Sequence, residues 1–205
     1  MSRLIGLLAV VLVIGGVTYS VWNLYQWNES KQSVQAIDHS KSVTVKNTEL
    51  QPKKALEKEN SSKGTSTLVY DYQDGEKIAN LEIPKINSNF DVFWNTDDST
   101  LEKGVGMYVS KWTTIPNETG GHTVVSGHRD TVFTELGNLE KGDTINVDYD
   151  EDSYTYIIKD IWITDEEDRT VIVKKDKPTL TLTTCYPFDY IGAAPDRYII
   201  QAELE

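Results

Sequence analysis

The chain has 205 residues, a formal net charge of −12 and one cysteine. The negative charge lies after residue 70, where 27 Asp and Glu stand against 12 Lys and Arg, compared with 5 and 8 in residues 1–70. Such an acidic surface repels a phosphate backbone, which excludes nucleic-acid binding, and a single cysteine excludes an internal disulfide.

The N-terminal segment is predicted to be a membrane anchor. From Leu4 to Tyr25 the sequence is almost wholly apolar and uncharged, and these 22 residues would form a helix of about 33 Å, against about 30 Å for the hydrocarbon core of a bilayer. A cleaved signal peptide is the alternative, but the candidate cleavage triplet Thr18-Tyr19-Ser20 lies inside the apolar run. With Arg3 as the cytoplasmic charge, we expect residues 1–27 to be a single-pass anchor in the cell membrane, with the remainder outside.

Residues 28–75 are predicted to be a flexible tether. They are polar, include the low-complexity pieces KKALEKEN and SSKGTS, and show no sustained helical or strand periodicity. As a coil the segment would span on the order of 40 Å, which would hold a folded domain away from the membrane.

Residues 76–205 are predicted to form one all-β domain, a barrel or a sandwich. Short runs of alternating apolar and polar residues recur with turn residues between them. The predicted strands lie within 78–87, 90–96, 121–128, 144–149, 153–164, 179–185 and 197–204. The glycine-rich stretches 101–107 and 134–143 are expected to hold a helical turn or two at most. About 130 residues suffice for one core and not for two.

Alternation in the last two strands places Cys185 and Arg197 together. Leu180 and Leu182 must face the core, so Cys185 faces the opposite side of its strand. In 197–204 the even-numbered residues are apolar, so Arg197 also points away from the core. If loop 186–196 joins neighbouring strands, the thiol and the guanidinium flank it on one side of the sheet.

The lone cysteine is therefore predicted to be a nucleophile. A buried small hydrophobe is the usual alternative, but the polar face argues against it. A free thiol has a pKa of about 8.5, and nearby positive charge favours the reactive thiolate. Of the three histidines, His39 lies in the tether, whereas His128 ends an apolar strand, from which its ring could project over the edge of the sheet. A surface histidine in a turn is the alternative for His128.

Two charged residues follow His128. Arg129 is expected to point away from His128 by strand alternation and to have a surface role. Asp130 either orients the His128 ring or, in keeping with its turn position, caps its own backbone.

No metal site and no cofactor are predicted. The ligands that His122, His128 and Cys185 could offer have no close spacing. The acidic stretches 148–153 and 164–168 lack the glycine and the glutamate spacing of a calcium-binding loop, so a solvated charged surface is the preferred interpretation.

Together these residues resemble the sortase family. The run Thr181-Leu182-Thr183-Thr184-Cys185 matches a TLxTC motif, Ser126-Gly127-His128 matches an upstream SGH, and Arg197 opens the last strand. The stretches SGHRDTVF and TLTTCYPFDYIGAAPDRYII are similar to class D sortases in particular. The resemblance covers about residues 76–205, and the N-terminal anchor and tether also fit the layout of the family.

The resemblance implies an eight-stranded β-barrel and a membrane-bound cysteine transpeptidase on the outer face of Gram-positive cells. Such enzymes cleave surface proteins after the threonine of a Leu-Pro-x-Thr-Gly or Leu-Pro-x-Thr-Ala sorting signal and pass the acyl group to an amine of the cell-wall precursor. It implies that Cys185 is the nucleophile, His128 the general acid, and Arg197 the donor to the carbonyl oxygen. Thr184, beside the nucleophile, is a candidate substrate-binding residue, although parity also places it on the core side. A hydrolytic cysteine peptidase and a non-enzymatic anchored domain are the alternatives.

Overall fold

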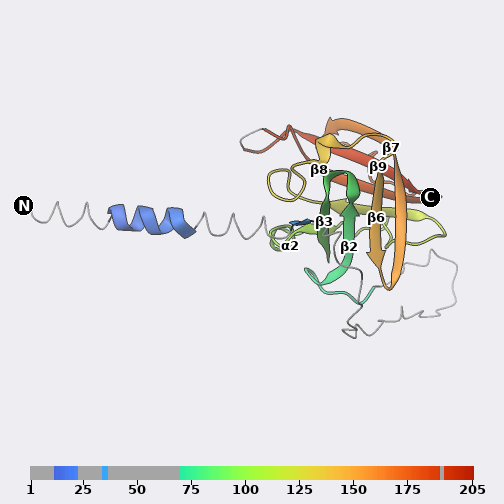
Figure 1. The fold of residues 1–205 in the computed structure, drawn as a ribbon, viewed down its shortest axis with the longest axis horizontal. Helices are drawn as coiled ribbons and strands as arrows, with labels where there is room; N and C mark the ends of the chain where they lie inside the picture. Colours follow the sequence, from blue (N-terminus) through green and yellow to red (C-terminus); the bar gives the residue numbers. More distant parts are fainter. Residues whose placement is uncertain (1–11, 23–33, 37–69, 190–191) are drawn as a thin grey trace, which may run out of the picture.

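The computed structural model describes residues 12–22, 34–36, 70–189 and 192–205 of the chain (Figure 1). Within these residues, eight strands form the body of the molecule: β2 (Lys77–Ile83), β3 (Ser88–Trp94), β4 (Val105–Met107), β5 (Gly121–Ser126), β6 (Thr144–Tyr149), β7 (Asp152–Asp165), β8 (Pro178–Tyr186) and β9 (Asp196–Leu204). The short helical segments between them are η1 (Pro84–Ile86), α2 (Asp98–Leu101) and η2 (Leu136–Asn138).

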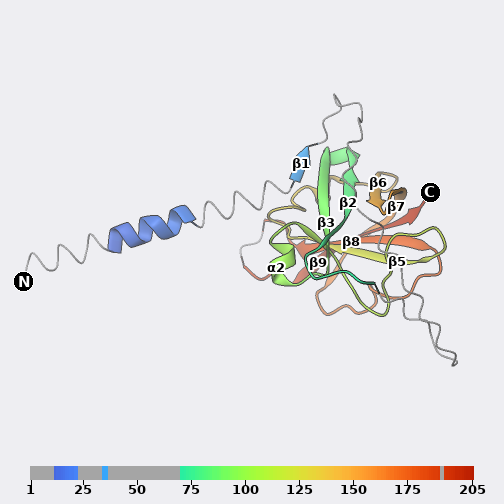
Figure 2. The same cartoon turned by 90° about the horizontal axis from the view of Figure 1, so that it is seen from below.

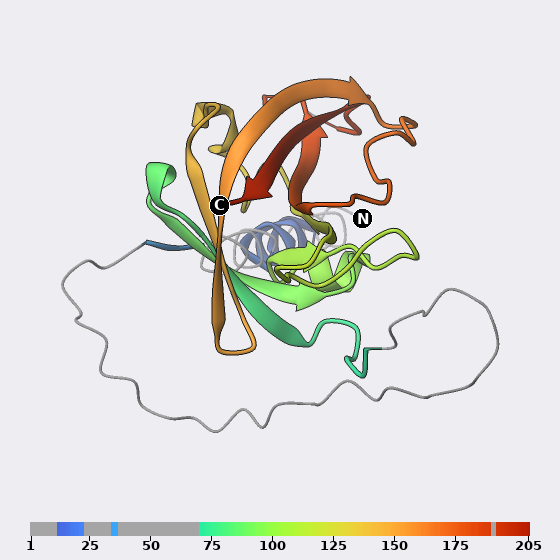
Figure 3. The ribbon, with the colours of Figure 1, turned by 90° about the vertical axis from the view of Figure 1, so that its right-hand side faces the viewer.

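The eight strands close into a barrel. Their order is β3-β2-β6-β7-β9-β8-β5-β4, and β4 pairs in parallel with β3 to complete the ring. β5 and β8 also pair in parallel and lie side by side (Figure 2), and the remaining pairs of the ring are antiparallel. The long strand β7 arches from β6 to β9 and shifts register between Ile158 and Asp160 (Figure 3). The predicted all-β barrel of eight strands is confirmed for this part of the chain.

Alternating side chains fill the interior of the barrel. On β6, Ile145 and Val147 are fully buried, whereas Thr144 and Asp148 are exposed. Each square ångström of apolar surface that is buried in this way stabilises the fold by about 25 cal/mol. Buried apolar side chains occupy the interior of this barrel, so we expect its chemically active groups on the outer wall or the rim.

One strand was not predicted. β4 lies in the stretch 101–107, where only a helical turn was expected, and all three of its residues are buried. Three residues are too few to show a period of two. A Cβ atom at Gly106 would lie 2.4 Å from the carbonyl oxygen of Asn95, so a glycine is required where β4 closes the barrel against β3.

The predicted anchor is described only in part. Residues 12–22 form a helix, and no helix in the described part of the chain is long and apolar enough to cross a membrane. The rest of residues 1–27 lies outside the described residues.

Two parts of the predicted tether, residues 28–75, contact the barrel. The short strand β1 (Val34–Ala36) pairs antiparallel with the beginning of β3. Tyr70 and Tyr72 pack against the ring of Trp94, with ring centroids 5.5 and 5.0 Å apart. The C-terminal end of the predicted tether therefore packs against the barrel, and residues 37–69 lie outside the described part.

Candidate active site

Cys185 and Arg197 lie opposite each other at the ends of β8 and β9. The two strands are antiparallel neighbours, as the sequence predicts, and their register pairs Cys185 with Arg197. On its other side Arg197 pairs with Thr164 of β7. Directly opposed residues have Cβ atoms about 5 Å apart on the same face of a sheet. The thiol and the guanidinium therefore start from adjacent positions.

The sheet face that carries these residues is only partly open. Leu180 and Leu182 are fully buried in the core, and Cys185 lies on the opposite face with intermediate exposure, as alternation predicts. Thr181, on that same outer face, is nevertheless 0 % exposed. The connection between β7 and β8 lies over it, because the His122 ring bridges the Val173 carbonyl oxygen (2.8 Å) and the Thr181 hydroxyl (2.7 Å).

His128 is held against the strand that carries the cysteine. The parallel pairing of β5 with β8 ends where Ser126 lies opposite Thr183. Beyond it, the Gly127 N–H donates to the Thr183 carbonyl oxygen at 3.2 Å, and the Thr184 hydroxyl donates to the Gly127 carbonyl oxygen at 2.7 Å. Two hydrogen bonds thus join the residue before His128 to the two residues before Cys185.

The turn at His128 depends on a glycine. A Cβ atom at Gly127 would lie 2.8 Å from the side chains of both Val132 and Phe133. Phe133 is fully buried, and its N–H donates to the His128 carbonyl oxygen at 2.9 Å. The backbone of His128 is thereby fixed, while its side chain is exposed.

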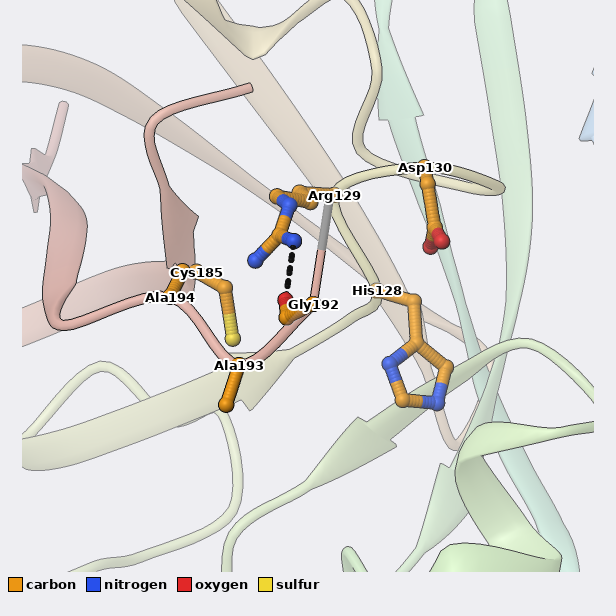
Figure 4. Close-up of a pocket in the computed structure, with 7 residues that line it drawn as sticks. All are labelled: His128, Arg129, Asp130, Cys185, Gly192, Ala193 and Ala194. Carbon is orange, nitrogen blue, oxygen red and sulfur yellow. Dashed lines mark hydrogen bonds between the residues drawn. The ribbon is translucent and has the colours of Figure 1, made fainter. Parts of the chain in front are cut away.

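Two cavities meet at Cys185, and among the described residues only Cys185 and His128 line both. The first, called here the larger cleft, has a volume of about 450 Å³. Its other lining residues include Leu101, Tyr108, Asp165, Glu166, Asp168, Val171, Ile172, Thr184, Arg197 and Ile199. The second, called the smaller pocket, has a volume of about 220 Å³ and is completed by Arg129, Asp130, Gly192, Ala193 and Ala194 (Figure 4).

Thr184 lies mainly beneath the site. It was predicted to contact substrate, and the structure places it in the wall of the larger cleft with 3 % of its surface exposed. Its hydroxyl is used in the bond to the Gly127 carbonyl oxygen. This contact positions the turn before His128.

The Arg197 guanidinium bridges two loops. Nη1 donates to the carbonyl oxygens of Ala194 and Asp196 at 3.2 and 3.0 Å, and Nη2 donates to Glu166 Oε2 at 3.0 Å. A guanidinium carries five N–H groups, so the Nε–H and the second Nη2–H have no partner among the described residues. The side chains of Arg197 and Glu166 are 31 % and 48 % exposed, and solvent screening limits such a pair to about 1 kcal/mol of folding stability.

Arg129 faces the site, contrary to the prediction from alternation. Its Nη2 donates to the Gly192 carbonyl oxygen at 2.7 Å (Figure 4). The prediction was wrong because β5 ends at Ser126, and alternation does not extend into the following loop. Asp130 also lines the smaller pocket, but within the described residues no hydrogen bond joins its carboxylate to His128.

His122 is a buried structural residue. A carbonyl oxygen can only accept, so Nδ1 donates to Val173 and Nε2 accepts from the Thr181 hydroxyl. Burial lowers the pKa of the His122 ring, and the nearby Lys175 adds to this effect while the bond to Val173 opposes it. The described part of the chain contains no group of three or more His, Cys, Asp and Glu side chains that could hold a metal ion.

The acidic run 164–168, which the sequence analysis interpreted as a solvated charged surface rather than as calcium ligands, contributes side chains to the site. The hydroxyl groups of Thr164 and Thr170 donate to Asp168, and these bonds lower the pKa of its carboxyl group. They shape the loop from which Glu166 reaches Arg197. The only sequence signal for this contact was the position of the run at the end of a predicted strand, which is β7 and pairs with β9.

Comparison with known proteins identifies relatives over most of the chain. Residues 81–205 match the family model of the sortase domain. The chain is 41 % identical over 162 residues to sortase D of Bacillus subtilis (strain 168), which covers 77 % of this chain and 80 % of that protein. The solved catalytic domain of B. anthracis SrtD is 58 % identical, with a TM-score of 0.58, over 71 % of this chain and 97 % of that one. Sortase C of Clostridium perfringens, solved with the C-terminal cell wall sorting motif, is 26 % identical, with a TM-score of 0.59, over 66 % and 74 %.

Proposed function

The chain belongs to the sortase family of cysteine transpeptidases, and we propose that it cleaves surface proteins after the threonine of a C-terminal Leu-Pro-x-Thr-Gly or Leu-Pro-x-Thr-Ala signal. The acyl group then passes to an amine of the cell-wall precursor. The observation that carries the proposal is the strand register that sets Cys185 opposite Arg197, with His128 lining the same cavities. The C. perfringens sortase C structure with its sorting motif supports this class of substrate.

The larger cleft suits the acyl donor. Its volume of about 450 Å³ lies within the usual range of ligand pockets, which are mostly apolar with a few placed polar groups. Leu101, Tyr108 and Ile172 offer apolar contacts for the leucine and proline side chains of a sorting signal. Cys185 and Arg197 line the same cleft, so a peptide bound there brings a carbonyl group to both.

The first half-reaction forms a thioester. The Cys185 thiolate attacks the threonine carbonyl carbon, the sulfur–carbon bond forms and the peptide carbon–nitrogen bond breaks. The leaving amine takes a proton from the His128 imidazolium, which becomes neutral imidazole. Even a small thiolate fraction supports this step, because thiolates are strong nucleophiles.

Arg197 would stabilise the oxygen of the attacked carbonyl. Its Nε–H and second Nη2–H can donate as negative charge develops on that oxygen, and a planar fork suits this task. Glu166 and the Ala194 carbonyl oxygen hold the other edge of the guanidinium. Glu166 is thus a positioning residue that acts through Arg197.

A hydrolytic cysteine peptidase is the second candidate. The exposure of the His128 side chain favours it, because water can reach a thioester formed beside this ring. Mass spectrometry of the products with and without an added amine separates the two functions, since a peptidase yields only the free acid.

We also propose that residues 1–27 anchor the enzyme in the cell membrane and that residues 28–75 tether the catalytic domain, residues 76–205, on the outer side. The uncharged apolar run from Leu4 to Tyr25 supports this arrangement. Fractionation of cells tests it: the full chain should sediment with membranes, and a chain that starts at residue 28 should not.

The central experiment traps the acyl-enzyme. The full-length chain is mixed with a small library of Leu-Pro-x-Thr peptides, quenched in acid and analysed by mass spectrometry. We expect an adduct on Cys185 that ends at the threonine, and none in Cys185→Ala. Cleavage by Cys185→Ala, or an adduct elsewhere, would refute the proposed function.

A further inference from the structure

Two cavities give access to Cys185. The larger cleft and the smaller pocket share only Cys185 and His128 among the described residues. A transpeptidase must bring two substrates in turn to the same carbonyl carbon. While the acyl donor is bonded to Cys185 and fills the larger cleft, the smaller pocket is a second route to the thioester.

We propose that the smaller pocket is the acceptor site, that it receives a primary amine on an unbranched carbon, and that Asp130 attracts this group as an ammonium ion. The inference rests on the proposed function, because it concerns the second substrate of that reaction. It assigns a binding role to Asp130 that differs from orienting His128.

The shape of the smaller pocket selects a slender group. Its volume is about 220 Å³, against about 450 Å³ for the larger cleft. Among the described residues, the wall opposite His128 is formed by Gly192, Ala193 and Ala194, whose side chains are at most a methyl group. Two cations hold this wall in place: Arg129 through the Gly192 carbonyl oxygen at 2.7 Å and Arg197 through the Ala194 carbonyl oxygen at 3.2 Å.

On the His128 side of the smaller pocket, the Asp130 carboxylate offers a negative charge to an ammonium ion. The Arg129 guanidinium in the same lining is instead bonded to the Gly192 carbonyl oxygen. In the view of Figure 4, Asp130 and His128 lie on one side of the Arg129–Gly192 bond, and Cys185 lies on the other. Asp130 is exposed, so its carboxylate is accessible to an arriving cation. The net charge of residues 71–205 is −15 (12 basic minus 27 acidic residues), which raises the local concentration of cationic acceptors.

The second half-reaction balances with these groups. An alkyl ammonium ion with a pKa of about 10 is protonated on arrival, and it releases one proton to solvent to become the free amine. The amine nitrogen attacks the thioester carbonyl carbon, the nitrogen–carbon bond forms and the carbon–sulfur bond breaks. The second proton passes to the neutral His128 imidazole, and Cys185 leaves as thiolate. The Cys185 thiolate and the His128 imidazolium are thereby regenerated.

The partition of the acyl-enzyme tests the inference. The full-length chain is acylated with a Leu-Pro-x-Thr peptide, and the ratio of amide to acid product is measured against amine concentration. The acceptors are Nα-acetyl-lysine amide, glycinamide and alaninamide. Asp130→Asn should raise the amine concentration needed for equal amide and acid by about fivefold, the upper scale of an exposed ion pair. Ala193→Val, which narrows the pocket, should shift the partition toward acid for every amine.

Asp148→Asn is the charge-matched control, because Asp148 on β6 is exposed and lines neither cavity. It should leave the partition within about twofold of the wild type, since it removes the same charge without touching the pocket. An equal shift in Asp130→Asn and Asp148→Asn, or no shift in Asp130→Asn, would overturn the inference. So would a preference for alaninamide over both unbranched amines.

Release of the leaving peptide reports the first half-reaction separately. If the wild type releases none, the proposed function fails. If the wild type releases peptide but Asp130→Asn leaves the ratio of amide to acid unchanged, only the proposed acceptor site is refuted. Transfer to either unbranched amine supports the acceptor site, and their order identifies a lysine-type ε-amine or a glycine α-amine as the natural source.

Discussion

Replacement of Thr184 by valine should lower both the stability of the barrel and its turnover number. The Thr184 hydroxyl donates to the Gly127 carbonyl oxygen at 2.7 Å, and Thr184 is 3 % exposed. Valine has nearly the same shape but no donor, so it leaves that carbonyl oxygen without this partner. His128 follows Gly127 directly, so the loss also loosens the turn that carries the ring.

The expected magnitude follows from the burial of this bond. Leaving a buried carbonyl group without its donor costs about 1–3 kcal/mol. For a domain of this size, that corresponds to a fall in Tm of roughly 3–12 °C. If about 1.4 kcal/mol of the loss appears as misplacement of His128 in the transition state, kcat falls about tenfold. The KM for the peptide should change little, because the hydroxyl is engaged below the surface of the larger cleft.

Thr184→Ser is the matched control. Serine keeps the donor and removes one methyl group, which costs about 1 kcal/mol of stability, so its kcat should stay within about twofold of the wild type. Thermal unfolding followed by circular dichroism and cleavage of a quenched Leu-Pro-x-Thr peptide measure the two effects. A Thr184→Val protein with wild-type kcat would refute the link between this hydroxyl and His128, whatever its Tm.

Three further predictions concern Arg197, Glu166 and His122. Arg197→Ala should lower kcat/KM in peptide cleavage about 10²-fold or more, the scale for removing a carbonyl-oxygen donor, and an intact rate would exclude that role. Glu166→Gln should lower kcat several-fold, because Glu166 positions Arg197. It should change the free energy of unfolding by less than about 1 kcal/mol, because the ion pair is partly exposed. Lower stability with an unchanged kcat would instead show a merely structural contact. Burial lowers the pKa of His122 below its ordinary 6.5, so the unfolded chain binds the proton more readily than the folded chain. The neutral ring therefore contributes its full stability above pH 6.5, and this contribution is lost as the pH falls toward the folded pKa. Between pH 7 and 5 the Tm of the wild type should therefore fall more steeply than that of His122→Gln, and parallel slopes would contradict this account.

Strand alternation predicted much of the barrel and half of the site. The expected strand 144–149 is β6 without a change in its bounds, and Leu180 and Leu182 face the core as expected. The same counting placed Cys185 and Arg197 on one outer face, and the register of β8 and β9 sets them directly opposite each other.

Strand alternation makes no prediction for residues in loops. Arg129 was expected at the surface, but it lines the smaller pocket and bonds to Gly192, which is 63 residues away in the sequence. In the acidic run, Asp165, Glu166 and Glu167 are exposed as expected, but nothing in their pattern indicated that Glu166 bonds to Arg197. β4, at three residues, was too short for its period to be detected.

Strand alternation in the sequence was enough to predict the fold class, the faces of the long strands and the proposed nucleophile, because alternation is a local property of an extended chain and needs no knowledge of distant residues. Alternation could not reveal where His128 lies relative to Cys185, that both residues line two cavities, or which charges flank each cavity. These depend on contacts such as Gly127 against Phe133 and Thr184 with Gly127, which form only when segments far apart in the sequence pack together.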